Sequence, residues 1–181
     1  MNRYIQNLLK INEYQADKIR QDYWMSYGST LKGLIRNYDV NPNNFLNKTH
    51  DIKNYSDLIF PAYNLVRILS NLDGRKILFT NAPKIYALNI INHCNIGRFF
   101  QDFHFIENSN FNGKPSKESM KKFLSKYRIE QAYFVDDEKE NLKVAKFYGI
   151  KTIWINKSKK KPIYIDKKIS SLKELQKLRS L

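Results

Sequence analysis

The sequence predicts an α/β fold, in which a doubly wound parallel sheet follows a helical N-terminal region. After about residue 60, short apolar runs typical of strands alternate with amphipathic segments typical of helices. Residues 1–60 instead repeat apolar residues at helical spacing and contain little that resembles a strand. We therefore expect a helical region at 1–60 and an α/β unit at 61–181.

Three helices are expected in the N-terminal region. The first carries an apolar stripe from Tyr4 to Ile11, and the second, over 13–27, ends at Gly28, since glycine readily adopts the left-handed backbone that closes helices. Ser29 or Thr30 can cap a third helix. The polar stretch "NPNN" at 41–44 predicts a turn.

The α/β unit is expected to begin with a helix from Pro61 to Leu72. The predicted strands are "KILFTN" (76–81), "FQDFHFI" (100–106), "AYFVDD" (132–137), "KTIWIN" (151–156) and the short "PIYID" (162–166). The predicted helices between and after them are 83–94, 116–127, 139–149 and 171–178, the last with a capping box of Ser171 and Glu174. The run at 76–81 is so apolar that we expect it to be buried on both faces.

Composition excludes several classes of protein. Cys94 is the only cysteine, so the sequence has neither a disulfide framework nor a cysteine metal site, and it favours a reducing, cytoplasmic location. No apolar run is long enough to cross a membrane, and the N-terminus lacks the features of a secretory signal. The sequence does not determine the oligomeric state.

The net charge of +15 raises the possibility of nucleic-acid binding. However, the basic residues are 24 Lys and only 8 Arg, and Asn and Ile occur 20 times each, as an AT-rich genome would produce. The charges are also spread along the chain, apart from the block "NKSKKKP" at 156–162. We favour a solvated basic surface over a nucleic-acid footprint.

Polar groups follow the predicted strands at three places. Thr80 and Asn81 follow one strand, Asp136 and Asp137 end another, and Lys114 lies in the loop "NGKPSKES". Ligands bind at the carboxyl ends of the strands in such sheets, so these groups are candidates for one site. Thr80–Asn81 can cradle a phosphate, Lys114 can neutralise an anion, and the two carboxylates can hold Mg²⁺.

Each of these features also has a structural explanation. Thr80 or Asn81 can cap the following helix, and Lys114 can be one more surface lysine. The acids can complement the N-terminus of the helix that follows them, an explanation that suits Asp136 better than Asp137. Asn141, one helical turn beyond Asp137, can brace it. His50, His93 and His104 have no ligand spacing and are expected to be core or surface residues.

The order and spacing of three segments resemble the last three signature motifs of the haloacid dehalogenase-like hydrolases, and more narrowly those of the pyrimidine 5′-nucleotidase group. The segments are "KILFTNAP", "FNGKPSKESM" and "YFVDDEKENLKVAKFYGIKTIWI", and "DYWMSYGSTLKGLI" is similar to the cap segment of that group. The resemblance implies a Rossmann-like core with an N-terminal helical cap. Its activity would be Mg²⁺-dependent hydrolysis of nucleoside monophosphates through an aspartyl-phosphate.

The resemblance also implies roles for single residues. Thr80 would bind the phosphoryl group with Asn81 beside it, and Lys114 would balance charge between the phosphate and the nucleophile. Asp137 would bind the magnesium ion, because family members place an asparagine four residues later, as Asn141 is here. Asp136 matches a position that is usually acidic.

One motif of the family is missing from the sequence. The nucleophile and the acid belong to a first strand that ends in D-x-D-x-T, and no D-x-D ends any predicted strand among the 181 residues. The absent strand and its loop, about 20–30 residues, would occupy the centre of the sheet, between "KILFT" and "AYFVDD". Those two strands would then have unpaired edges or would pair with each other.

We therefore expect the chain to be inactive by itself. A truncated or misassigned start, gene decay, and retention as a non-catalytic binder of nucleic acid or phosphorylated ligands are the alternatives, in that order of preference.

Overall fold

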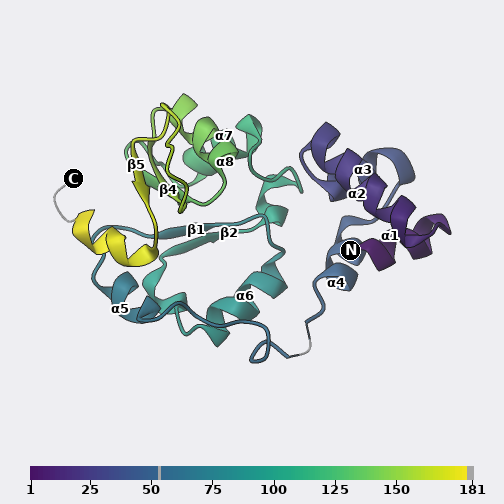
Figure 1. Ribbon diagram of the computed structural model, residues 1–181, viewed down its shortest axis with the longest axis horizontal. Coiled ribbons are helices and arrows are strands. Elements are labelled where there is room, and N and C mark those ends of the chain that lie inside the picture. Colours follow the sequence, from purple (N-terminus) through teal and green to yellow (C-terminus); the bar gives the residue numbers. More distant parts are fainter. Residues whose placement is uncertain (53, 179–181) are drawn as a thin grey trace.

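The computed structural model describes residues 1–52 and 54–178, so the last three residues of the predicted 61–181 unit lie outside the described residues (Figure 1). The described strands are β1 (Ile77–Phe79), β2 (Asp102–His104), β3 (Tyr133–Asp136), β4 (Lys151–Ile155) and β5 (Lys167–Ile169). They form two parallel sheets, one of β1 and β2 and one in the order β3–β4–β5. The predicted α/β fold with parallel strands is confirmed.

Helices alternate with these strands, as the sequence predicts. The α-helices are α1 (Asn2–Leu9), α2 (Glu13–Tyr27), α3 (Thr30–Tyr38), α4 (Pro42–Thr49), α5 (Leu65–Ser70), α6 (Lys84–His93), α7 (Lys117–Lys126) and α8 (Lys139–Phe147). Short 3₁₀ segments are η1 (Gly97–Phe99), η2 (Ile106–Ser109) and η3 (Leu172–Leu178). None of the helices in the described part of the chain has the length and apolar character needed to span a membrane.

The helices α1–α4 pack on one another at one end of the molecule (Figure 1). Their shared core is built on Ile5, Leu34 and Phe45, all fully or almost fully buried. Gly28 closes α2 with a positive φ of 77°, and the Ser29 hydroxyl accepts a hydrogen bond from the Lys32 amide at the start of α3. These two helix boundaries are as predicted.

The turn predicted at 41–44 is wrong, because this stretch begins the helix α4. The Asn41 side chain accepts a hydrogen bond from the amide of Asn44, and Pro42 occupies the first turn. Proline is well suited to that position, since its missing N–H has no partner to lose there. The same residues that indicate a turn therefore serve as an N-terminal cap.

The first sheet is covered by a helix on each face, as in a doubly wound fold (Figure 1). On one face, Phe79 of β1 stacks on Phe123 of α7 with 4.3 Å between ring centroids. On the other, Leu78 packs against Ala87 and Ile91 of α6. Successive side chains of a strand point to opposite faces, so the continuous apolar sequence of β1 serves both layers.

The second sheet also has a core on each side. Leu142 of α8 packs with Trp154 and Ile165 in one cluster. In another cluster, Ile153 of β4 packs with Ile169 of β5 and Leu175 of η3. The middle strand β4 is therefore well buried at Thr152, Ile153 and Trp154.

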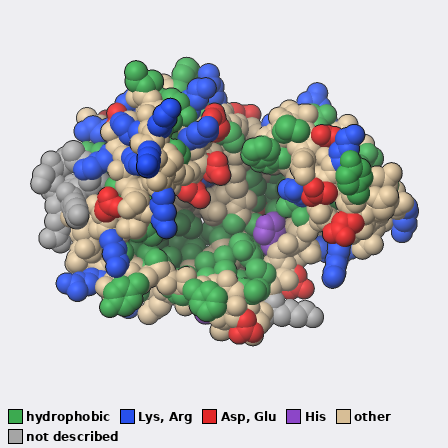
Figure 2. Space-filling model, viewed as in Figure 1, with side chains coloured by type: hydrophobic (Ala, Val, Ile, Leu, Met, Phe, Trp, Pro, Cys, Tyr) green, Lys and Arg blue, Asp and Glu red, His purple; other side chains and the backbone are tan. Residues whose placement is uncertain are grey.

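Full burial of the strand at 76–81 is a wrong prediction, because Ile77, Leu78 and Phe79 are only half-buried. Among the described residues, β1 pairs with β2 alone and β3 with β4 alone, so each has one edge without a neighbouring strand there. The strands β1 and β3 do not pair with each other, although the rings of Phe79 and Phe134 approach to 6.2 Å between centroids. Figure 2 shows a hollow with a hydrophobic floor over the region of β1 and β2.

Two elements near the ends of the α/β unit also differ from the prediction. The helix predicted from Pro61 to Leu72 is shortened to α5, with a turn before it. The last strand is β5 rather than 162–166, because the Asp166 carboxylate accepts hydrogen bonds from the Thr152 amide and hydroxyl and holds that stretch as a turn. Near the C-terminal end, Glu174 of the predicted capping box accepts a hydrogen bond from the Ser170 amide.

Candidate active site

The centre of the candidate site is an ion pair between Lys114 and Asp136. The Lys114 Nζ donates to Asp136 Oδ2 at 2.6 Å, and the two side chains are only 12% and 6% exposed. Lys114 comes from the loop before α7, whereas Asp136 is the last residue of β3. The structure thus brings together two charged residues that are 22 positions apart in the sequence.

The other oxygen of the Asp136 carboxylate is held by the start of α8. Asp136 Oδ1 accepts from the Glu138 amide at 2.9 Å and from Asn141 Nδ2 at 3.0 Å. Charged acceptors near a helix N-terminus are stabilised by the free amides there. Both oxygens of this buried carboxylate are therefore matched with donors.

This arrangement corrects the predicted partner of Asn141. The side chain of Asn141 braces Asp136, five residues before it, and not Asp137. The reason is that Asp136 ends the strand pointing inward, whereas Asp137 begins the turn and is exposed. Spacing along an ideal helix does not apply to Asp137, because α8 begins only at Lys139.

Asn81 fixes the loop that carries Lys114. Its Nδ2 donates to the Lys114 carbonyl at 2.8 Å, and its Oδ1 accepts from the Lys114 amide at 2.7 Å. Gly113 leaves room for this contact, since a Cβ there would lie 2.4 Å from Asn81 Oδ1. In the structure, then, Asn81 positions Lys114 through its backbone.

Thr80 lies directly before Asn81, at the end of β1. Its amide donates to the His104 carbonyl at 2.9 Å and continues the β1–β2 ladder by one residue. The Thr80 hydroxyl accepts from the amide of Ala82 at 3.0 Å, so it organises the turn into α6. The predicted capping of α6 by Thr80 or Asn81 is wrong, because the helix is preceded by Pro83 and its first amide, that of Lys84, donates to the Glu107 carboxylate. The Thr80 hydroxyl can still donate its proton to a ligand.

Two phenylalanines enclose the ammonium of Lys114, a feature that sequence reasoning missed. The Lys114 Nζ lies 5.2 Å from the ring centroid of Phe79 and 5.4 Å from that of Phe134. These distances fall within the range of cation–π attraction. Side chains two residues apart on a strand point to the same face. Phe134 lies two residues before Asp136 and Phe79 two residues before Asn81, so this alternation could have predicted that both rings lie near the site.

The residues fit part of a magnesium site. Asp136 is engaged by Lys114 and Asn141, whereas the exposed Asp137 uses its backbone carbonyl to accept from Trp154 Nε1 at 2.8 Å. Within the described residues, no group of three His, Cys, Asp or Glu side chains is placed to hold a metal ion. Mg²⁺ needs only one or two carboxylates when waters and phosphate oxygens complete its octahedron, so the acids can supply part of the coordination.

A cavity of about 250 Å³ lies between the N-terminal helices and the Lys114 loop. Its walls include Tyr27, Ser29 and Lys32 on one side and Asn112 and Ser116 on the other. The Lys32 Nζ donates to Asn112 Oδ1 at 3.1 Å and links the two sides. The exposed Trp24 is not among the lining residues, whereas Tyr27 is.

Most of the chain resembles a known protein family. Residues 3–155 match the family model of the haloacid dehalogenase-like hydrolases. The chain belongs to this family. The match extends over the N-terminal helices and over Thr80, Lys114 and Asp136, and it favours a hydrolase family over a nucleic-acid-binding protein.

A curated relative and two solved structures extend this result. The chain is 23% identical to phosphate metabolism protein 8 of Saccharomyces cerevisiae over 173 residues, which are 83% of this chain and 52% of the relative. The chain therefore spans about half the length of the curated relative it matches. The HAD phosphatase from Thermococcus onnurineus is similar with a TM-score of 0.66 and 17% identity, covering 99% of this chain and 86% of that one.

The second structure is the HAD-hydrolase YfnB from Bacillus subtilis, which was solved bound to magnesium. Its TM-score is 0.62 at 18% identity, and the alignment covers 99% of this chain and 89% of that one. Identities this low establish a shared fold, and the two haloacid dehalogenase-like structures confirm the fold class.

Proposed function

We propose that the chain is the larger part of a Mg²⁺-dependent phosphomonoester hydrolase that acts on nucleoside monophosphates. The observation that carries the proposal is the nearly buried ion pair of Lys114 and Asp136, fixed to β1 through Asn81. An ammonium held at the carboxyl ends of two strands is suited to neutralise a phosphoryl group. Thr80 would donate its hydroxyl proton to the same group, and Asn81 would keep the Lys114 loop in place.

The magnesium ion would be held by Asp137, with Asp136 beside it and Asn141 orienting Asp136. When bound, the ion would polarise the phosphoryl oxygens and neutralise their charge. Asp137 is exposed at the start of α8 and free to turn toward a ligand, which suits a carboxylate that must reach a metal ion. A magnesium-bound protein of the same fold supports this assignment.

In this proposal the nucleophile is an aspartate outside these 181 residues. It would attack the phosphorus atom, form an aspartyl-phosphate and release the nucleoside, and water would then hydrolyse the acyl phosphate. The open edges of β1 and β3 support this proposal, because one added strand would pair with both and join the two sheets. Such a strand would cover part of the hollow with a hydrophobic floor over the region of β1 and β2 (Figure 2).

The helical region 1–60 would serve as a cap over the phosphate site, with the rest of the chain as the core. We place the nucleoside in the 250 Å³ cavity beside the Lys114 loop, where the Tyr27 ring can contact a base. A cytoplasmic location agrees with the single, unpaired Cys94.

The test is phosphatase activity with and without the missing strand. The 1–181 chain, assayed with MgCl₂ and nucleoside monophosphates, is expected to turn over at background rate. A chain extended by the codons upstream of Met1 is expected to contain an apolar strand ending in D-x-D-x-T and to be active. Asp137→Asn should abolish that activity, and Lys143→Gln, an exposed change on α8, should not. Activity of the 1–181 chain that Asp137→Asn removes would refute the need for an outside nucleophile.

A further inference from the structure

His104, at the end of β2, is a buried histidine that the proposed hydrolase mechanism does not use. It is 1% exposed and packs edge-on against Phe79 and Phe123. Its Nε2 shares a 2.8 Å hydrogen bond with the Ser109 hydroxyl, which in turn lies 2.7 Å from the Ser119 hydroxyl. Its Nδ1 is the buried side-chain atom that has no hydrogen-bond partner among the described residues.

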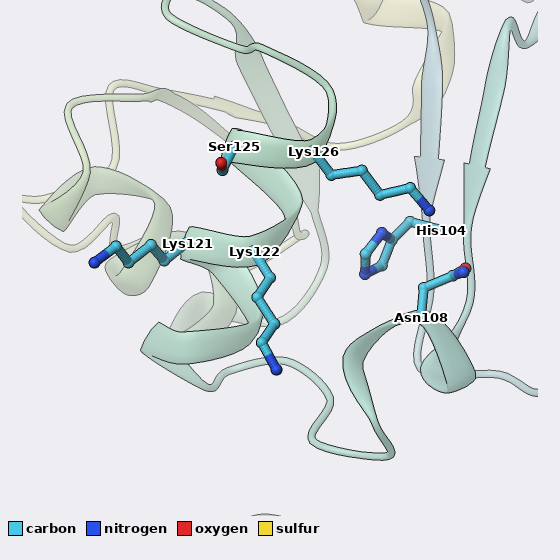
Figure 3. Close-up of a pocket in the computed structure, with 6 residues that line it drawn as sticks. All are labelled: His104, Asn108, Lys121, Lys122, Ser125 and Lys126. Atoms are coloured by element: carbon cyan, nitrogen blue, oxygen red, sulfur yellow. The ribbon is translucent and has the colours of Figure 1, made fainter.

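An open cavity of about 420 Å³ adjoins this histidine. It is lined by His104, Asn108, Lys121, Lys122, Ser125 and Lys126. Figure 3 shows the imidazole of His104 pointing from β2 toward α7, into the space flanked by Lys122 and Lys126. Lys121 and Ser125 point away from His104 in the same view.

The polar groups around this space are donors. Asn108 Oδ1 accepts from the Phe105 amide, which leaves its Nδ2 to donate outward. Lys122 forms an exposed ion pair with Glu118, whereas no carboxylate lies within ion-pair distance of Lys126 in the described part of the chain. The lining residues in the described ranges 1–52 and 54–178 include no acidic side chain.

The buried hydroxyls allow His104 to join these donors while it stays neutral. If Ser119 donates to Ser109 and Ser109 donates to Nε2, the single imidazole proton resides on Nδ1, which then needs an acceptor. An oxyanion in the cavity supplies acceptors to Nδ1, to both ammonium groups and to Asn108. It would also relieve the repulsion between the like charges of Lys122 and Lys126, which are neighbours one helical turn apart.

We propose that the cavity beside His104 is a second anion site, which binds a small phosphate-type oxyanion. This site goes beyond the proposed phosphatase centre and is built from different side chains. The anion could be free phosphate or the phosphoryl group of a small monoester, since both present the same oxygens. Binding would use Lys126, Lys122 and Asn108 at the mouth and His104 Nδ1 at the back.

The experiment is a calorimetric titration of the 1–181 chain with sodium phosphate at pH 7 and low ionic strength, without magnesium. Each titration is run on the original chain and on a Lys114→Gln chain whose folding has been checked by circular dichroism, because this change removes the ammonium of the candidate active site and so separates the two proposals. We expect saturable binding that Lys126→Gln weakens about tenfold, as expected for the loss of one charged hydrogen bond. Lys121→Gln is the matched control, on the same helix but pointing away, and should change the affinity less than twofold.

A second readout follows the histidine itself. The imidazole ¹⁵N resonances of His104 should shift on addition of phosphate and report a proton on Nδ1, whereas those of the exposed His93 should not. Methyl phosphate in place of phosphate distinguishes the two sources: binding of both assigns a terminal phosphoryl group, and binding of phosphate alone assigns the free anion. Either result supports the site.

Three outcomes would overturn the proposal. One is the absence of saturable phosphate binding in the Lys114→Gln protein. Another is an equal loss of affinity in Lys121→Gln and Lys126→Gln, which would indicate diffuse charge attraction. The third is binding of a single-stranded oligonucleotide but not of phosphate, with a steep dependence on salt, which would assign these lysines to a nucleic-acid surface.

Discussion

Lys114 shows how one residue can connect three parts of the chain. Its ammonium pairs with Asp136 of β3, its backbone is held by Asn81 after β1, and its side chain passes between Phe79 and Phe134. A charge removed from water in this way is stable only while its partner is present. The structural importance of Lys114 can therefore be tested separately from any catalytic role.

Replacing Lys114 by glutamine should destabilise the protein. The change leaves the Asp136 carboxylate buried without its cation, although Glu138 and Asn141 still donate to it, so we expect a loss of about 2–4 kcal/mol in the free energy of unfolding. Urea denaturation followed by circular dichroism measures this. Lys121→Gln, an exposed change without an ion pair, is the control and should stay within about 0.5 kcal/mol of the original. Equal midpoints for both variants would contradict the prediction.

His104 should make stability depend on pH. Burial, and secondly the charge of Lys126, lowers the pKa of His104 from 6.5 to about 4. Between these values the unfolded chain binds more protons than the folded one, so stability is full above pH 6.5 and falls as the pH falls. From pH 7 to pH 5 the loss due to this group is about 2 kcal/mol.

The comparison that isolates this effect is His104→Asn, which cannot titrate. The difference in unfolding free energy between pH 7 and pH 5 should be smaller in this variant by about the same 2 kcal/mol. His93→Gln, which removes an exposed histidine, should keep the full dependence on pH. If the original protein and His104→Asn lost equal stability on acidification, the buried imidazole would not be the cause.

Single residues of the site could be predicted from the sequence where a motif gave both the residue type and its place near the end of a strand. Lys114 contacts both Asn81 and Asp136, because its loop lies at the carboxyl ends of β1 and β3. Sequence reasoning failed for Asn141, whose partner depends on which way Asp136 turns at the end of β3. It also could not foresee the hydrogen bond of His104 to Ser109, or that of Ser109 to Ser119, because the three residues belong to different elements.

At the scale of elements, the contact between α2 and α3 depends on a glycine. Gly33 lies in the interior of α3, where glycine usually weakens a helix. Its position is explained by Tyr23 of α2, because a Cβ on Gly33 would lie 2.4–2.6 Å from the Cβ, Cγ and Cδ2 of that side chain. The near end of the ring cannot move away without shifting the helix.

Gly33→Ala should therefore destabilise the protein, even though alanine favours the helix. The gain in helix propensity is about 1 kcal/mol, and overpacking against Tyr23 costs about 1–3 kcal/mol, so we expect a net loss. The sign should reverse in a Tyr23→Ala background, where the space is open and only the propensity remains. Urea denaturation of the four proteins measures both effects. A gain in stability from Gly33→Ala in the original chain would show that α2 and α3 separate easily.

Elements with strong local signals were predicted well. Gly28 and Ser29 set the boundary between α2 and α3, and Gly149 follows α8 as expected. Elements that depend on contacts distant in sequence were predicted less well. Asp166 accepts a hydrogen bond from the Thr152 amide, 14 residues away, and the last strand is therefore β5 and not 162–166. The helix α4 was missed for a different reason, since Asn41 and Pro42 are equally common in turns and at helix starts.

At the scale of the whole molecule, the sequence correctly predicts that helices cover the sheet, but it does not predict how far β1 is buried. The alternation of strands and helices predicts two faces covered by helices, and the first sheet has them. The burial of β1 depends on what pairs with its second edge, and a strand cannot specify its neighbours by its own composition. The half-buried state of β1 and the hydrophobic hollow in Figure 2 thus have one cause, the division of the sheet.

This division predicts a pattern of amide exchange. The Thr80 amide faces β2, so by alternation the Phe79 amide faces the open edge of β1. The Ala132 carbonyl accepts from Lys151 of β4, so the amide of Val135 likewise faces the open edge of β3. The residues of β4, by contrast, have a strand on each side.

Hydrogen exchange followed by NMR should therefore separate these strands. We expect the amides of Phe79 and Val135 to exchange at least tenfold faster than that of Ile153, because an edge amide opens without breaking the sheet whereas a central one requires a larger unfolding event. Measurements at two protein concentrations, a factor of ten apart, control for edge-to-edge association of two copies, which would protect the same amides at the higher concentration. Slow exchange of Phe79 and Val135 at both concentrations would mean that the two sheets close on each other in solution, and the room for an added strand between β1 and β3 would then be absent.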